Sequence, residues 1–204
     1  MSILPGIEIS RFRKADHDIL PIFVQRWSPR AMSAEPIPPG DILRLLEAAR
    51  WAPSSYNEQP WRFLYARRDT PHWRTFLDIL LPANQVWAKH AAALFLICSK
   101  KNFSRNNQPN IVHTFDCGSA WENFALQGAH MGLVVHGMAG FDKDKARKDL
   151  KIPDTFDIEA MIAVGKPGKI DDLPEHLRGM DREPSGRKKV SEFAAEGAFP
   201  GSFA

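Results

Sequence analysis

The chain has 204 residues, of which 44% are hydrophobic and 25% are charged, and its formal net charge at pH 7 is +3. These values are typical of a single folded domain, residues 1–204, that buries a sizeable core, and they exclude a disordered chain. Lys and Arg residues are spread along the whole chain, so the basic balance suits an anionic small ligand as well as nucleic acid.

Hydrophobic periodicity predicts the secondary structure in chain order. Residues 1–15 have no clear period and predict an extended or loosely attached N-terminal arm. The expected helices cover residues 16–25 with Pro21 in the opening turn, a segment through Ile42 and Ala49 that ends before Pro53, and residues 70–81, 83–90, 115–131 and 142–150. The expected strands cover residues 61–67, 91–99, 133–138 and 158–164, and the apolar run 91–99 predicts a central strand. Residues 166–204 have too few apolar residues for a core and predict a C-terminal arm that wraps over something else, for which another subunit is one candidate.

The segment RWSPR follows the first predicted helix and carries two arginines and a hydroxyl at alternate positions. Pro29 disfavours helix at Ser28, so an extended segment points Arg26, Ser28 and Arg30 to one side. Guanidinium groups stay charged and match phosphate geometry, so this side is a candidate anion site. Two surface arginines that pair with carboxylates are the alternative.

The stretch RWAPSSYNEQPWRF, residues 50–63, links the second predicted helix to an aromatic strand. Ser54, Ser55, Asn57 and Gln59 supply two hydroxyls and two amides that both donate and accept hydrogen bonds. Such a set of donors and acceptors suits hydrogen bonding to the edge of a flat heteroaromatic ring. A surface loop rich in turn-forming residues is an equally weighted alternative.

Three later segments have features that suit ligand contacts. The strand 133–138 ends in GMAGF, where two glycines permit close approach of another group. Arg187, Lys188 and Lys189 follow Ser185 and Gly186, which indicates either a second anion site or a solvated run of charge. The polar segment KKNFSRNNQPN, residues 100–110, predicts a mobile loop that is either a lid or simply solvated.

Other chemistries have weaker support in the sequence. Cys98 and Cys117 are separated by eighteen residues, which excludes a CxxC pair, and we expect reduced thiols with Cys98 buried, in a cytoplasmic protein. His113 and Cys117 share a helix face, but two ligands do not complete a metal site, and we expect no metal. The N-terminus lacks the pattern of a signal peptide, and no stretch has the length of a membrane-spanning helix.

The order of the motifs is more specific than any one of them. RWSPR, APSSYNEQPWRF, GMAGFD and a late VGKPG followed by EPSGRK together resemble the nitroreductase family of flavin mononucleotide (FMN) oxidoreductases, over about residues 16–193. The resemblance implies an α+β fold with a mixed sheet flanked by helices. It also implies an intertwined homodimer with FMN at the subunit interface, so that the arm 166–204 wraps the partner subunit.

The resemblance implies four FMN-binding segments. The phosphate and pyrimidine end of FMN would be held by Arg26, Ser28 and Arg30. The flavin would be reached from the partner subunit by Pro53, Ser54, Ser55 and Asn57. The flavin ring near its N5 edge would lie against Met138, Ala139 and Gly140. Arg187 and Lys188 would close over the phosphate. Trp27 stands after Arg26, where many members of the family have a second basic residue or His. A fixed cation near N1 and O2 stabilises the reduced flavin, and we expect Arg30 in that role.

The implied function is an NAD(P)H-dependent oxidoreductase that passes a hydride through FMN to an electron-poor acceptor, such as a nitroaromatic or a quinone, by a ping-pong mechanism. Because the flavin carries the chemistry, no catalytic residue of the protein is expected. The alternatives are another flavin reaction (dehalogenation, flavin cleavage, or reduction of an enal or semialdehyde) and a flavin-binding protein without turnover. A nucleic-acid module is disfavoured because the aromatic residues lie at core spacings rather than between basic residues.

Overall fold

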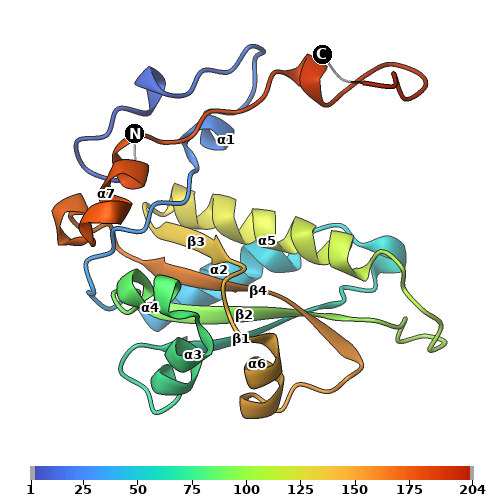
Figure 1. Ribbon diagram of the computed structural model, residues 1–204. Helices are drawn as coiled ribbons and strands as arrows, with labels where there is room; N and C mark the ends of the chain where they lie inside the picture. The colour runs from blue at the N-terminus through green and yellow to red at the C-terminus, as the bar shows by residue number, and fades with distance from the viewer. Residues whose placement is uncertain (1–2, 203–204) are drawn as a thin grey trace.

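The computed structural model describes residues 3–202, which form a four-stranded sheet with helices on both faces (Figure 1). The strands, in the spatial order β1-β2-β4-β3, are β1 (Trp61–Arg67), β2 (Ala93–Lys100), β3 (Val134–Met138) and β4 (Phe156–Gly165). The helices are α1 (Pro21–Gln25), α2 (Pro39–Arg50), α3 (Trp73–Ile79), α4 (Pro82–Ala88), α5 (His113–His130), α6 (Lys143–Asp149) and α7 (Glu175–Arg182). No helix within residues 3–202 combines the length and apolarity needed to cross a lipid bilayer.

The α+β architecture is confirmed, and the sheet itself is antiparallel rather than mixed. β2 pairs with β1 and with β4, and β3 pairs with β4, each in antiparallel register. The four described strands therefore alternate in direction across the sheet, and none of them runs parallel to its neighbour. The predicted central strand corresponds to β2, whose residues are buried up to its last position.

Two hydrophobic layers lie on the two faces of this sheet. Phe95 of β2 faces α5, where its ring packs edge-on against Phe124 at a centroid distance of 5.0 Å. Leu96, the next residue, faces the opposite layer, which contains Trp87 of α4. Alternate side chains of β2 thus belong to different layers, which explains why the strand is apolar at every position.

The long helix α5 packs closely on the sheet because it carries a small residue at the contact. A Cβ atom at Gly128 would lie 2.3 Å from Cγ2 of Val135 in β3. After the helix, Gly132 adopts a left-handed φ of 71°, which is the conformation that glycine favours at a helix C-terminus. The predicted helix over residues 115–131 is confirmed within two residues at its start and one at its end.

Two helix boundaries differ from the prediction for local reasons. α1 begins at Pro21 rather than residue 16, because proline lacks the N–H donor needed inside a helix and is confined to the first turn. α3 begins at Trp73 rather than Thr70. The Thr70 hydroxyl donates to the carbonyl oxygen of Arg67 at 2.8 Å instead of capping the helix.

The N-terminal segment, residues 3–15, packs against the domain rather than being loosely attached. The exposed fractions of Leu4, Ile9 and Arg13 are 1%, 7% and 8%. These buried positions follow no helix or strand period, so sequence periodicity gave no sign of them. Residues 1–2 of the predicted arm lie outside the described part of the chain.

The C-terminal segment has two parts. Residues 166–182 fold back on their own chain, with Leu173 and Leu177 buried in the layer that contains α4. Residues 183–202 are mostly exposed; residues 186–193 run beside the N-terminal segment and α1, and the residues after them extend away from both (Figure 1). Residues 203–204 of the predicted arm lie outside the described residues.

Both cysteines are free and buried, as expected for Cys98. Burial raises the pKa of each thiol to about 12. The thiolate form, which is the reactive one, is therefore scarce at neutral pH.

Two glycines of α5 test the close packing of this helix. Gly128→Ala should lower the free energy of unfolding by about 1–3 kcal/mol, because the added methyl meets a β-branched side chain that has little freedom to move. Gly118→Ala is the matched control. It has open space around its Cβ position and should raise stability by about 0.5–1 kcal/mol through helix propensity. Urea unfolding of both variants measures the difference, and equal effects would contradict the packing argument.

Candidate functional site

The segment RWSPR leaves α1 and extends along α5 and β3. The Arg26 side chain is 15% exposed; its Nη1 donates to Oγ of Ser28 at 3.2 Å, and its Nε lies 3.8 Å from Oε1 of Glu122 in α5. Burial lowers the pKa of Arg26, and Glu122 opposes that shift. Trp27 is buried, so its side chain contributes packing at this position. The structure thus brings Arg26 and Ser28 together.

Arg30 is bound to an acidic residue that lies 151 positions further along the chain. Asp181 of α7, whose side chain is fully buried, accepts hydrogen bonds from the main-chain N–H of Arg30 at 2.5 Å and of Ala31 at 2.8 Å. Nη1 of Arg30 lies 3.4 Å from the other carboxylate oxygen of Asp181, Oδ1. Burial raises the pKa of Asp181, and the two main-chain donors and the Arg30 charge act against that rise.

The sequence reasoning missed Asp181, although one pattern pointed to it. Leu177 and Asp181 are four residues apart and lie on the same face of α7, and both are buried. An acidic residue on the apolar face of a short helix indicates a carboxylate with an internal partner.

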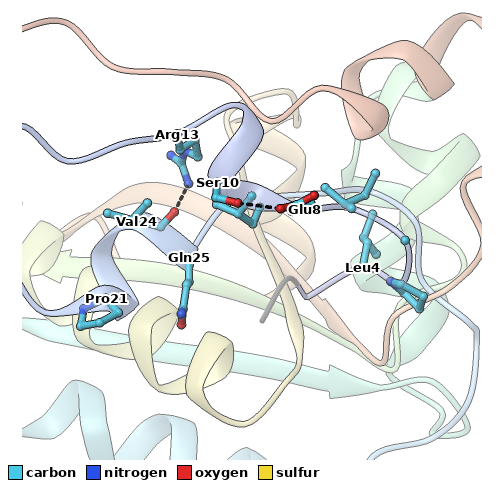
Figure 2. A pocket seen from close by; sticks show the side chains of 11 residues that line it. Leu4, Glu8, Ser10, Arg13, Pro21, Val24 and Gln25 are labelled. Atoms are coloured by element: carbon cyan, nitrogen blue, oxygen red, sulfur yellow. Dashed lines mark hydrogen bonds between the residues drawn. The ribbon is translucent and has the colours of Figure 1, made fainter.

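Arg13 of the N-terminal segment is a second residue that the sequence reasoning missed. Its Nη1 donates to the carbonyl oxygen of Val24 at 2.9 Å (Figure 2) and to that of Arg26 at 2.6 Å. Burial, together with the nearby charges of Arg187 and Arg26, lowers the pKa of Arg13 to about 10. No sequence pattern distinguishes Arg13 from the other arginines near the N-terminus.

Two cavities flank Arg13. The first, of about 760 Å³, lies between the N-terminal segment and α1. Leu4 and Glu8 bound it on one side, and Pro21 and Gln25 bound it on the other (Figure 2).

The second cavity, of about 740 Å³, lies between the N-terminal and C-terminal segments. Arg187 and Lys188 line it together with Arg13. The Arg187 guanidinium donates to the carbonyl oxygen of Gly186 at 2.8 Å. Because Arg13 also binds the backbone of Arg26, basic residues from three distant segments meet here.

The GMAG segment is fixed at the end of β3. Met138 is buried in the core, whereas Ala139 is exposed. The carbonyl oxygen of Gly140 accepts from Nδ2 of Asn84 at 2.9 Å and from the N–H of Leu81 at 3.1 Å. A Cβ atom at Gly140 would lie 2.6 Å from that Nδ2, so only glycine allows this approach. The main chain of this segment, rather than the Met138 side chain, faces outward.

His136 connects β3 to the RWSPR segment. Its Nδ1 lies 3.1 Å from the carbonyl oxygen of Pro29, and its ring packs on Trp87 at a centroid distance of 4.7 Å. Burial, reinforced by the Arg30 charge, lowers the pKa of His136 to about 4. The imidazole is therefore neutral at pH 7 and donates from Nδ1 to Pro29, which keeps RWSPR beside the GMAG segment.

The segment 53–59 has a strained backbone. Tyr56, Asn57 and Gln59 adopt positive φ values of 51°, 56° and 51°, a conformation that non-glycine residues seldom adopt. Ser54 holds this turn: its carbonyl oxygen accepts from the N–H of Asn57 and its Oγ accepts from the N–H of Gln59, both at 3.0 Å.

The same segment is attached to the first turn of α5. The N–H of Ser55 donates to Oδ2 of Asp116 at 3.1 Å, and Pro53 is exposed. Glu122, which lies beside Arg26, is in the middle of α5 and on another face of the helix. Within one chain, residues 53–57 are thus anchored apart from the arginines.

The polar segment 100–110 is a folded turn that grips residues 53–59, rather than a detached loop. Asn102 and Pro109 form an antiparallel bridge, and the N–H and hydroxyl of Ser104 donate to Oε1 of Glu58 at 2.9 and 2.6 Å. The Arg105 guanidinium lies 4.1 Å from the centroid of the Tyr56 ring, within cation–π distance.

His113 makes local contacts and belongs to no metal site. Its Nδ1 lies 2.7 Å from Oγ of Ser99, which also donates to Glu159, and its Nε2 lies 3.7 Å from Oδ2 of Asp157. Among residues 3–202, no three His, Cys, Asp or Glu side chains are grouped so that they could hold a metal ion.

Comparison with known proteins places these features in a family. The model of the "Nitroreductase family" matches residues 23–81 and 74–166. A relative from Archaeoglobus fulgidus, named "Putative NADH dehydrogenase/NAD(P)H nitroreductase", is 26% identical over 154 residues, which are 74% of this chain and 86% of that protein. The NADH dehydrogenase of Thermus thermophilus is 24% identical over 190 residues, 78% of this chain and 91% of that protein. A solved oxidoreductase described as containing FMN is 39% identical, with a TM-score of 0.88 over 92% of this chain and 96% of that chain.

The pKa of His136 gives a prediction on acid stability. The folded protein keeps the imidazole neutral down to about pH 4, whereas the unfolded chain takes up a proton near pH 6.5, so the free energy of unfolding should fall as the pH falls between these values. The contribution of this one group is about 3 kcal/mol across the window. Urea unfolding at pH 7.5, 6 and 4.5 should show a flatter pH dependence for His136→Asn than for the exposed control His176→Asn. Identical slopes for the two variants would refute the assignment.

Proposed function

The chain belongs to the nitroreductase family of oxidoreductases, and from this premise we propose that it binds FMN and uses NAD(P)H to reduce an electron-poor acceptor, such as a nitroaromatic or a quinone, by a ping-pong mechanism. The 39% identical oxidoreductase contains FMN, which supports the choice of cofactor. The two free, buried thiols suit a reducing, cytoplasmic location.

The observation that carries this proposal is the group of arginines at the end of α1. Arg26 and Arg13 are largely buried, and Arg187 is close enough to lower the pKa of both. A phosphate dianion is the ligand that such a group of guanidiniums binds best, because each fork supplies charge-assisted hydrogen bonds. In this arrangement Arg26, Ser28, Arg187 and Lys188 hold the FMN phosphate.

The remaining residues of this end of the molecule suit the flavin ring. Arg30 supplies positive charge at the N1 and O2 side, and Asp181 fixes the backbone from which its side chain extends. The main chain of Met138, Ala139 and Gly140 would lie against the N5 edge, where Gly140 adds no side chain of its own. Bound FMN would supply the hydride-transfer chemistry, and the residues of the protein would bind, orient and shield it.

The site is complete only in a homodimer. The N–H of Ser55 is bound to Asp116, so this segment is held away from the arginines of its own chain. This supports a reach of Pro53, Ser54, Ser55 and Asn57 to the flavin of a partner subunit. Large apolar side chains exposed on the α1, α2 and α5 side of the chain support an interface there; they are Leu20, Phe23, Leu43, Trp51, Ile111 and Phe115. Residues 194–202, which extend away from the domain beyond the second cavity (Figure 1), are the part of the C-terminal arm that wraps the partner.

The visible spectrum tests cofactor and reaction type together. Purified protein, or apoprotein mixed with FMN, should show flavin absorbance that NADH or NADPH bleaches under anaerobic conditions and that a quinone or nitroaromatic restores. The amount of flavin reoxidised, measured from the restored absorbance, should equal the amount of acceptor reduced by two electrons, because the hydride carries two electrons. Protein that neither contains nor binds FMN would overturn the proposal. If FMN is bound but neither NADH nor NADPH reduces it, the result supports the alternative of a flavin-binding protein without turnover.

Two complementary variants test the shared site. Light scattering should give twice the chain mass of 23.0 kDa. Arg26→Ala removes a contact from one side of the site, and Asn57→Gly removes the amide from the other side while keeping the positive φ. Each variant alone should bind FMN weakly. A co-expressed mixed dimer should regain one tight site, because one of its two sites draws both residues from unmutated positions. A monomer, or a mixed dimer without regained binding, contradicts the shared site.

A further inference from the structure

We propose that Arg13 is a third guanidinium of the phosphate site and that it positions Arg26, so that the N-terminal segment is part of the cofactor site. This inference rests on the proposed binding of FMN. It concerns a residue that lies outside the four FMN-binding segments implied by the sequence.

The position of Arg13 is fixed by burial and by two hydrogen bonds. Its exposed fraction is 8%, and one nitrogen, Nη1, donates to the carbonyl oxygen of Val24 (Figure 2) and to that of Arg26. These two carbonyls lie at the C-terminal end of α1, where helix carbonyls lack partners of their own. Arg13 therefore holds the main chain from which the Arg26 side chain extends.

The local charge balance favours the binding of an anion beside Arg13. In the described part of the chain, no carboxylate lies within 4.0 Å of the Arg13 guanidinium, and Arg26 has only Glu122, at 3.8 Å and 47% exposed. A buried cation without a counter-charge is unfavourable, and two neighbouring cations increase that cost. The reduced pKa of Arg13 reflects this cost. An anion of charge about −2, such as a phosphate monoester, would relieve it.

Arg11 provides an internal comparison. It lies two residues earlier on the same segment, its side chain is 75% exposed, and its Nε pairs with Oε2 of Glu8 at 2.6 Å. Arg11 thus behaves as an ordinary surface arginine, whereas Arg13 is buried and has no carboxylate partner among the described residues. Arg13 also borders both cavities, including the one that Arg187 and Lys188 line.

A structural role alone does not explain the choice of residue at this position. Two carbonyl oxygens are satisfied by any buried donor, and a neutral one would avoid repulsion from Arg26 and Arg187. Trp27, which follows Arg26, is buried and carries no charge. Arg13 of the N-terminal segment therefore supplies the positive charge that the RWSPR segment lacks at Trp27.

The test compares FMN with riboflavin, which has the same ring and ribityl chain but no phosphate. Dissociation constants for both are measured by flavin fluorescence on full-length apoprotein, for the unmutated chain and for Arg13→Ala, Arg13→Lys, Arg11→Ala and Arg26→Ala. Arg13→Ala should weaken FMN binding by about tenfold or more and leave riboflavin binding within about twofold, because a charge-assisted contact to phosphate is lost. Arg13→Lys should recover part of the loss by restoring the charge, and Arg11→Ala should have no effect.

The possible outcomes separate this inference from the proposed function. Equal weakening of FMN and riboflavin by Arg13→Ala would reduce Arg13 to a structural role and overturn the inference, as would a Lys variant no better than Ala. A loss of FMN selectivity in Arg26→Ala but not in Arg13→Ala would keep the proposed function and reject the inference. An unmutated protein that binds neither flavin would reject both.

Discussion

The carboxylate of Asp181 joins two segments on which the rest of the site depends. It is fully buried and accepts hydrogen bonds from the main chain of Arg30 and Ala31, so that α7 is fixed against the RWSPR segment. A buried carboxylate must find such donors, because leaving it unpaired would cost several kcal/mol. This constraint sets where the C-terminal segment starts its return toward the N-terminal segment, and Arg187 then lies near Arg13 and Arg26.

The charges around this end of the molecule suit the anionic ligand that we propose. His136 is kept neutral beside Arg30, while Arg13 and Arg26 are buried with little acidic compensation. Such an arrangement costs folding stability and gains binding free energy, because the cations need not move when an anion arrives. The antiparallel sheet and its two apolar layers offset this cost.

Regular elements could be predicted from the sequence, and long-range polar contacts could not. The strand β2 and the helix α5 have strong periodicity or long apolar runs, so burial alone reveals them. RWSPR and the 53–57 segment are candidates because of their own charged and polar side chains, and motif order links them to one predicted site. Asp181 and Arg13 were missed because their partners are distant in sequence or are main-chain carbonyls, neither of which leaves a periodic trace. The buried N-terminal segment was missed for the same reason.

The contact between residues 102–109 and residues 54–59 has a consequence for how this enzyme diversifies. Ser104 and Arg105 hold Glu58 and Tyr56, in a stretch whose backbone is already strained. The outer turn and the inner segment are therefore coupled through Glu58 and Tyr56. Under the proposed cofactor site, an insertion in the turn would also change how residues 53–57 are held, so natural variation in this turn should be accompanied by compensating changes at Tyr56 and Glu58.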